Sequence, residues 1–332
     1  MPGMTTSVDA VAGGMTIGVS LSTFASDPAT SNVVDRAIEL ADEAGRVGID
    51  TVWLAQLFGY EAISVAALVG REVPSVGVGT SVVPIHPRHP IHLAGAAKTA
   101  QAATHGRFQL GIGLGAPALT GPTFGVDLAP AIRGLRDHLG ALRPLLDGEQ
   151  QAYHSPSVTS APPLPTSVAG AEPRIPLIVA AMGEQALRAT GELADGTLPF
   201  LAGPKVIREH IAPILRSAAE AAGRPEPRII VAVPAVVTDD VDAARVAARE
   251  ASAFYDEIPS YQKIIARNGS ERASDLFLLG DEATVLEGLQ EYLDAGATEI
   301  TLTQNDIVGD EARARTWAAV GAWSRESLDR SA

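Results

Sequence analysis

Polar side chains that could move or hold a proton follow two of the apolar runs in this sequence. Gln56 comes directly after the run Thr51–Ala55, and His86 lies in the loop Pro-Ile-His-Pro-Arg-His-Pro after the run Val76–Val82. A histidine exchanges protons near neutral pH, so His86 is a candidate proton donor, whereas the amide of Gln56 can only donate or accept a hydrogen bond. Helix capping or contact with solvent is the alternative for His86 and His89, and ordinary loop polarity is the alternative for Gln56.

Glycines gather between Ser75 and Gly115, in two apolar runs separated by an alanine-rich segment from Arg88 to Thr104. A strand, a helix and a second strand form a parallel crossover unit. Gly111 and Gly113 fall near the carboxyl end of the second strand, where a backbone without side chains can approach a flat or charged ligand. We interpret these glycines as a ligand contact, with relief of crowding between strands as the alternative.

The alternation of strand and helix continues along the whole chain. The runs predicted as strands are Met15–Leu21, Thr51–Ala55, Val76–Val82, Phe108–Ile112, Leu177–Ala181, Gly196–Phe200, Arg228–Val237 and Glu299–Thr303. Helical spacing of apolar residues predicts helices over 32–47, 61–71, 88–104, 131–146, 184–193, 205–222, 241–267 (with a break at Pro259), 281–295 and 310–328. Eight such units without a shift in composition favour a (β/α)8 TIM barrel with insertions.

A doubly wound open sheet is the main alternative to the barrel. Its dinucleotide-binding form carries Gly-x-Gly-x-x-Gly after the first strand, where this chain has Ser22-Thr-Phe-Ala-Ser26. The barrel is therefore favoured, and barrel enzymes place their chemistry on the loops after the strands. The aromatic residues Phe24, Phe58 and Tyr60 of those loops are candidate walls of a substrate pocket, although any barrel rim has aromatics.

The composition excludes several classes of function. The 332 residues are 46% hydrophobic and carry a net charge of −14, so we expect a substantial core and neither nucleic acid nor a membrane as a partner. The absence of cysteine excludes disulfides, thiolate metal sites and cysteine nucleophiles. No spacing of histidine and acidic residues indicates a metal site. We expect a cytoplasmic protein that binds a small-molecule substrate.

Three regions differ in their expected organisation. Residues 1–14 are small and polar, without the pattern of a signal peptide or a membrane span, and we expect a disordered extension. Residues 15–330 are expected to form a single barrel domain. Within it, the proline-rich stretch 147–176 interrupts the pattern, and loops of that length are commonly functional or disordered, so we expect it to fold over the barrel mouth as a lid.

Motifs at the strand ends resemble those of the bacterial-luciferase-like superfamily, and most closely its branch that uses coenzyme F420, an 8-hydroxy-5-deazaflavin, in place of flavin mononucleotide (FMN). The resemblance spans about residues 15–305. The motifs that carry it are Asp50-Thr-Val-Trp-Leu-Ala-Gln56, Gly77-Val-Gly-Thr-Ser-Val-Val-Pro84, Gly106-Arg-Phe-Gln-Leu-Gly-Ile-Gly113, Ile178-Val-Ala-Ala-Met-Gly183, Gly191-Glu-Leu-Ala-Asp-Gly196 and Asp294-Ala-Gly-Ala297. Each motif is weak alone, but six in this order on an eight-unit pattern are fairly specific.

The resemblance implies where a cofactor would lie. A non-proline cis peptide between Ser81 and Val82, after Thr80, would support one face of the deazaflavin ring and leave the other face open for hydride transfer. Backbone groups of Gly113, Leu114 and Gly115 would line the ring edge. The cofactor phosphate would lie at the helix start formed by Ala181, Met182 and Gly183, where N–H groups and the helix dipole favour an anion. Relatives are often dimers, so we expect a homodimer.

The differences from the family also carry information. Its sugar-phosphate dehydrogenases have Asp-His after the second strand and Glu after the fourth, where this chain has Ala55-Gln56 and Ala116. A neutral amide cannot act as the base for alcohol oxidation. We therefore expect a reductase that transfers hydride from reduced F420 to an electron-poor C=C or C=N bond. An FMN-dependent monooxygenase and a non-catalytic cofactor-binding barrel remain the alternatives.

Overall fold

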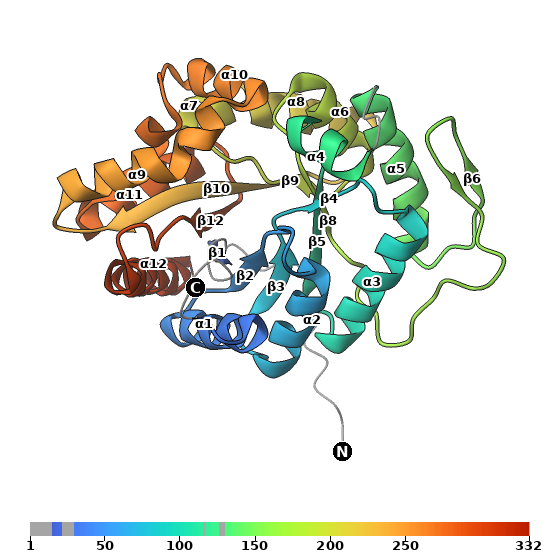
Figure 1. Ribbon diagram of the computed structural model, residues 1–332, viewed down its shortest axis with the longest axis horizontal. Coiled ribbons are helices and arrows are strands. Elements are labelled where there is room, and N and C mark those ends of the chain that lie inside the picture. Colours follow the sequence, from blue (N-terminus) through green and yellow to red (C-terminus); the bar gives the residue numbers. More distant parts are fainter. Residues whose placement is uncertain (1–14, 22–29, 116, 126–129, 332) are drawn as a thin grey trace.

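Eight parallel strands close into a barrel (Figure 1). The computed structural model describes residues 15–21, 30–115, 117–125 and 130–331. The barrel strands are β1 (Thr16–Leu21), β2 (Thr51–Leu54), β3 (Gly77–Thr80), β5 (Phe108–Gly113), β8 (Leu177–Ala180), β9 (Gly196–Thr197), β10 (Arg228–Val237) and β12 (Glu299–Thr303). Each pairs in parallel with the next, and β12 pairs with β1. The predicted (β/α)8 barrel is confirmed, and the open sheet was the wrong alternative because the ring of strands is closed.

Helices surround the strands and follow the predicted order (Figure 1). They are α1 (Val33–Val47), α2 (Ala62–Glu72), α3 (Pro90–Ala103), α5 (Ala131–Leu146), α6 (Glu184–Leu193), α8 (Ala212–Ala221), α11 (Glu282–Asp294) and α12 (Asp310–Ser331). Residues at the two ends of α1 explain its bounds. The Asn32 side chain accepts hydrogen bonds from the first N–H groups of the helix, and Gly48 ends it with a left-handed φ of 92°. Within the described ranges, no helix is long and apolar enough to cross a membrane.

Further elements lie between the barrel units. Pro259 divides the predicted long helical region into α9 (Val241–Asp256) and α10 (Pro259–Asn268), as expected. The remaining elements are β4 (Val83–Pro84), α4 (Pro117–Phe124), the hairpin of β6 (Tyr153–His154) and β7 (Thr159–Ser160), α7 (Pro204–Val206), a π-helical turn Ile207–Ile211, a 3₁₀ turn Ala273–Leu276 and β11 (Leu278–Gly280). β11 was not predicted, because three residues show no periodicity.

The proline-rich segment 147–176 runs along the outside of the barrel beside α3 and α5 (Figure 1). Its carbonyl groups accept hydrogen bonds from α3 side chains: Gln101 Nε2 donates to Pro173 at 2.7 Å, and Lys98 Nζ donates to Thr166. His89, which caps α3, lies 2.9 Å from the carbonyl oxygen of Thr159 through Nε2. The segment therefore covers these two helices, and its closure over the barrel mouth stays a prediction.

The indole of Trp53 fills the inside of the barrel. It is 1% exposed and packs with Ile178 of β8, with Ile230 and Ala232 of β10, and with Leu198 directly after β9. Glycines on the neighbouring strands provide the room for it: a Cβ atom at Gly79 would lie 2.5 Å from the Trp53 ring, and one at Gly18 would lie 2.7 Å from its Nε1. The prediction that Trp53 packs instead of stacking on a ligand agrees with this burial.

Substitution of Gly79 by alanine tests this packing. Because the new methyl group would overlap the Trp53 ring, we expect Gly79→Ala to lower the free energy of unfolding by about 1–3 kcal/mol in urea titrations. Gly95→Ala, on α3 with no atom within 4 Å of its Cβ position, is the matched control and should raise stability by about 0.5–1 kcal/mol. Equal effects of the two substitutions would refute the close contact.

Candidate functional site

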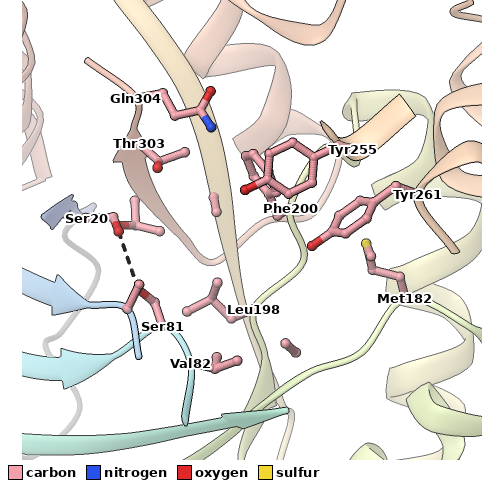
Figure 2. A pocket seen from close by; sticks show the side chains of 14 residues that line it. Ser20, Ser81, Val82, Met182, Leu198, Phe200, Tyr255, Tyr261, Thr303 and Gln304 are labelled. Atoms are coloured by element: carbon pink, nitrogen blue, oxygen red, sulfur yellow. Dashed lines mark hydrogen bonds between the residues drawn. The ribbon is translucent and has the colours of Figure 1, made fainter. Parts of the chain in front are cut away.

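A cavity of about 180 Å³ opens at the carboxyl ends of the barrel strands (Figure 2). Its lining comes from the strands β1, β8, β10 and β12, from loops that follow the barrel strands, and from the helices α9 and α10. The lining residues are Ser20, Ala55, Ser81, Val82, Ala180, Met182, Leu198, Phe200, Ala232, Tyr255, Tyr261, Thr301, Thr303 and Gln304. The position agrees with the general rule that barrels bind ligands at this end.

Hydroxyl groups and apolar side chains line the cavity, and none of its described lining residues is charged. The hydroxyls of Ser20 and Ser81 lie 3.4 Å apart, on adjoining sides of the barrel. Two polar atoms of the β12 side, Thr301 Oγ1 and Gln304 Oε1, are buried and have no hydrogen-bond partner among the residues that the structure describes. Such a site suits a neutral ligand with polar edges and disfavours a free charge.

The wall formed by β3 and β4 contains the predicted cis peptide between Ser81 and Val82, which is confirmed. Both residues line the cavity. Thr80, predicted beside them as a cofactor contact, is instead fully buried, and its hydroxyl donates to the carbonyl of Gly111 at 2.7 Å and accepts from its N–H at 3.0 Å. Thr80 therefore holds β3 to β5 and does not line the cavity.

The glycines of β5 leave room for the neighbouring strand and for the residues that follow it. A Cβ atom at Gly111 would lie 1.8 Å from the carbonyl oxygen of Thr80, and one at Gly113 would lie 2.8 Å from Val82 Cγ2. The crowding of neighbouring strands accounts for both glycines, and a contact of their backbone with a ligand stays a prediction. Leu114 packs against the core, and Gly115 turns the chain with a φ of 73°.

The end of β8 and the start of α6 form another wall. Met182 lines the cavity, and its carbonyl oxygen lies 2.9 Å from His210 Nε2, which fixes the backbone there. Ala181 is buried and hydrogen-bonded to Thr197. Gly183 is the N-cap of α6, is exposed, and has no atom within 4 Å of its Cβ position. The helix start at Gly183 is thus open, as a phosphate site requires, whereas Ala181 is not.

The side-chain amide of Gln56 forms hydrogen bonds within the protein. Its Nε2 donates at 2.5 Å to the carbonyl groups of Leu57 and Tyr60, and its Oε1 accepts from the Ala62 N–H and from Arg88. Gln56 does not line the cavity, so the structure brings no support to its predicted catalytic role. A hydrogen bond to a ligand would need one of these bonds to break. Gln56 instead joins the loop after β2 to the loop before α3.

The two predicted pocket aromatics that the structure describes, Phe58 and Tyr60, do not line the cavity. The hydroxyl of Tyr60 donates to the carbonyl of Ala55 at 2.5 Å, and burial raises the pKa of Tyr60 to about 12. Phe58 is 73% exposed and contacts Phe124, with ring centroids 6.3 Å apart. Phe24 lies outside the described residues.

His86 faces α5 and not the cavity lining. Its Nε2 lies 4.0 Å from the Cβ position of Gly134, and burial lowers the pKa of His86. The neighbouring His138 is 6% exposed, and no described residue forms a hydrogen bond with its Nε2. Burial first, and then His86 and His89, lower the pKa of His138 to about 3. None of these histidines lines the cavity, and the predicted role of His86 as a proton donor gains no support.

The sequence analysis missed two of the three aromatic residues, Phe200, Tyr255 and Tyr261, that form one side of the cavity, here called its roof. Phe200, Tyr255 and Tyr261 pack edge to face, with ring centroids 5.1 Å, 6.0 Å and 5.0 Å apart. They adjoin a small cluster of Leu201, Ile265 and Ala273 that is separate from the main core. Neither tyrosine follows a barrel strand, so the rule that selected strand ends did not find them. The loops that start at Phe200 and Gln304, in contrast, were among those singled out by that rule.

The sequence model of the luciferase-like monooxygenase family matches residues 15–299 of this chain. A putative coenzyme F420-dependent oxidoreductase of Mycobacterium tuberculosis is 28% identical over 210 residues, which are 58% of this chain and 57% of that protein. The chain therefore aligns with little more than half the length of that relative.

Solved structures share the fold. The coenzyme F420-dependent tetrahydromethanopterin reductase of Methanopyrus kandleri superposes with a TM-score of 0.73 and 19% identity, over 96% of this chain and 100% of that one. The oxygenating constituent of 3,6-diketocamphane monooxygenase of Pseudomonas putida, in complex with FMN, superposes with a TM-score of 0.74 and 17% identity, over 96% and 99% of the two chains. At this identity the likeness concerns the barrel alone.

The buried His138 makes stability depend on pH. Its pKa of about 3 in the folded protein lies below the ordinary value of 6.5, so the unfolded chain binds the proton more readily and stability falls as pH falls below 6.5. This side chain should remove about 2 kcal/mol of unfolding free energy between pH 7 and pH 5. Urea titrations at both pH values should show a smaller loss for His138→Leu than for the wild type.

His154→Gln, at an exposed position of β6, is the control and should keep the wild-type pH dependence. If His138→Leu kept it too, the buried neutral histidine would not be its source.

Proposed function

The chain belongs to the luciferase-like monooxygenase family, and from this premise we propose that it is an oxidoreductase that uses coenzyme F420. We infer that it acts as a reductase, in which hydride passes from reduced F420 to an electron-poor C=C or C=N bond of a small organic substrate. The observation that supports this direction is the cavity itself, because its described lining offers hydroxyl and amide groups and no carboxylate or imidazole.

The cavity fits the ring of a deazaflavin in chemistry and, in part, in size. Such a ring carries carbonyl, N–H and hydroxyl groups on its edges, and the hydroxyls of Ser20, Ser81 and Thr303 and the amide of Gln304 can meet them. A cavity of about 150 Å³ admits benzene. The cavity of about 180 Å³ therefore holds part of a ring system, and the remainder with its tail must extend out of the mouth.

The residues proposed to hold the cofactor are those of two walls. Ser81 and Val82 would contact one ring face, and the open helix start at Gly183 would receive the phosphate beside Met182. When bound, reduced F420 supplies a hydride. The protein contributes orientation, water exclusion and hydrogen bonds, and these are the means by which a site without a charged group can accelerate such a transfer.

The lining also bears on the reverse reaction. Oxidation of an alcohol requires a base that removes the hydroxyl proton. None of the described lining residues has a side chain that is such a base at neutral pH, and Gln56 and His86, the nearest candidates from sequence, point elsewhere. Reduction needs no base and takes its proton from water, so the proposed direction suits this site better.

Cofactor titration tests the first part of the proposal. We expect oxidised F420 to bind, with a change in its fluorescence, and FMN to bind more weakly. Ala180 is an exposed residue that lines the cavity, so Ala180→Phe should fill it without disturbing the fold and weaken F420 binding about ten- to a hundredfold. Ala221→Phe on α8, also exposed, is the matched control and should bind as the wild type does. Tight FMN binding without F420 binding would favour a monooxygenase instead.

Rapid mixing tests whether the protein catalyses reduction of a substrate or oxidation of an alcohol. The reduced F420 complex should be oxidised by cyclic enones or cyclic imines in stopped-flow absorbance traces, whereas the oxidised complex should remain oxidised with secondary alcohols. Absence of oxidation across a broad panel, with F420 bound, would favour a cofactor-binding barrel that has no catalytic role.

A further inference from the structure

Two phenol groups enter the cavity from one side. Tyr255 lies near the end of α9 and Tyr261 in the first turn of α10, and Figure 2 shows both hydroxyls directed toward the centre of the cavity. Neither hydroxyl has a hydrogen-bond partner among the described residues, whereas the hydroxyl of Tyr60 in the same region is bonded to a carbonyl. Two donors thus face the same space without an acceptor from the protein.

The rings that carry these hydroxyls are held in place. Tyr255 and Tyr261 contact each other edge to face at 5.0 Å, and both contact Phe200. Pro259 opens α10 two residues before Tyr261, and Asn268 at its end bonds to the N–H of Gly203 at 2.8 Å. Burial raises the pKa of both phenols, so both hydroxyls carry their protons at neutral pH. Fixed, protonated hydroxyls are hydrogen-bond donors of defined direction.

The opposite wall is formed by Ser81 and Val82, with Ser20 beside them (Figure 2). A flat molecule between the two walls would present one face to Val82 and an edge to the tyrosines. If the deazaflavin ring lies against Val82, as proposed above, then the tyrosines border the space on its open side, where a substrate must bind.

We propose that Tyr255 and Tyr261 form a donor pair that binds the carbonyl oxygen of a neutral, planar α,β-unsaturated carbonyl substrate. This inference rests on the proposed function for the identity of the reaction. Neutrality follows from the lining, since a carboxylate or phosphate would lose its water without meeting a cation there, and the protein carries a net charge of −14.

The chemistry balances with the reduced deazaflavin as reductant. Hydride adds to the β-carbon, the electron pair of the C=C bond moves toward the carbonyl, and the oxygen gains the charge of an enolate. The two tyrosine hydroxyls donate to that oxygen and stabilise it more strongly than the neutral carbonyl, which lowers the barrier. Water then gives a proton to the α-carbon, so the substrate gains two hydrogens and the deazaflavin is oxidised.

The phenols are unsuited to give that proton themselves. A general acid works best with a pKa near the operating pH, and the pKa of each of these tyrosines is raised above its ordinary value. Their role is therefore to bind and polarise the carbonyl, and the pH–rate profile should show no titration of a tyrosine near neutral pH.

Infrared difference spectroscopy of a bound probe tests the donor pair. The probe is cyclohex-2-enone with a ¹³C carbonyl, added to the F420-free protein and to the F420 complex. We expect the carbonyl stretch to move to lower frequency on binding, and this shift to diminish in Tyr255→Phe and in Tyr261→Phe, which keep the rings. Loss of one hydroxyl should weaken probe binding about two- to tenfold and slow oxidation of the reduced complex about a hundredfold.

Tyr292→Phe removes a hydroxyl from a buried tyrosine of α11, outside the cavity lining, and is the matched control. It should leave the stretch, the affinity and the rate unchanged. If both cavity variants kept the wild-type stretch and affinity, the donor pair would be refuted.

A second measurement needs no variant. The wild-type protein should bind cyclohex-2-enone more tightly than 1-methylcyclohexene, which lacks the carbonyl, and more tightly than 3-oxocyclohex-1-ene-1-carboxylate, which is anionic. Equal binding of the first two would overturn the carbonyl contact, and stronger binding of the anion would overturn neutrality. Failure of F420 to bind, with the carbonyl shift intact, would reject the proposed function alone. F420 binding without the shift would reject the donor pair alone.

Discussion

The placement of one indole inside the barrel limits how deep a ligand can enter. Trp53 reaches across to residues of β8 and β10 and to Leu198 after β9, and glycines on β1 and β3 leave the space that its ring requires. Leu198 and Ala232, which pack with this indole, also line the cavity, so the packed interior and the binding space share a boundary. The closed barrel is thus a filled core below and a binding space above.

That upper part has two walls of different origin. One wall is built from barrel strands and from the backbone around Ser81 and Met182, and the hydrogen bonds of Thr80 and His210 hold it rigid. The other is built from α9 and α10, outside the eight-unit repeat, and edge-to-face contacts hold its phenols. Rigid polar groups that need no reorganisation during a reaction are what electrostatic stabilisation requires. A cofactor on the first wall and a substrate against the second would meet in the space between them.

The strands and most helices could be predicted because buried parallel strands leave apolar runs and capped helices leave boundary signals, as at Asn32 and Gly48. The backbone at Ser81 and Val82 could be predicted from the family resemblance. Side-chain partners could not: the sequence does not reveal that the Gln56 amide is used by its own loop, or that Gly111 faces the Thr80 carbonyl. Tyr255 and Tyr261 were missed because their position in the cavity lining depends on how α9 and α10 pack, and no local sequence pattern encodes this packing.

The small cluster under the roof has a consequence for how this protein could diverge. Leu201, Ile265 and Ala273 form an apolar group of their own, apart from the main core, and Phe200, Tyr255 and Tyr261 pack on it. Substitutions of Ile265 or Ala273 would reshape the cavity with little effect on the main core, because residues without shared partners change stability nearly independently. Descendants could therefore acquire new ligand specificities by remodelling α9 and α10 while keeping the wall that the barrel strands build, because one scaffold can serve many activities.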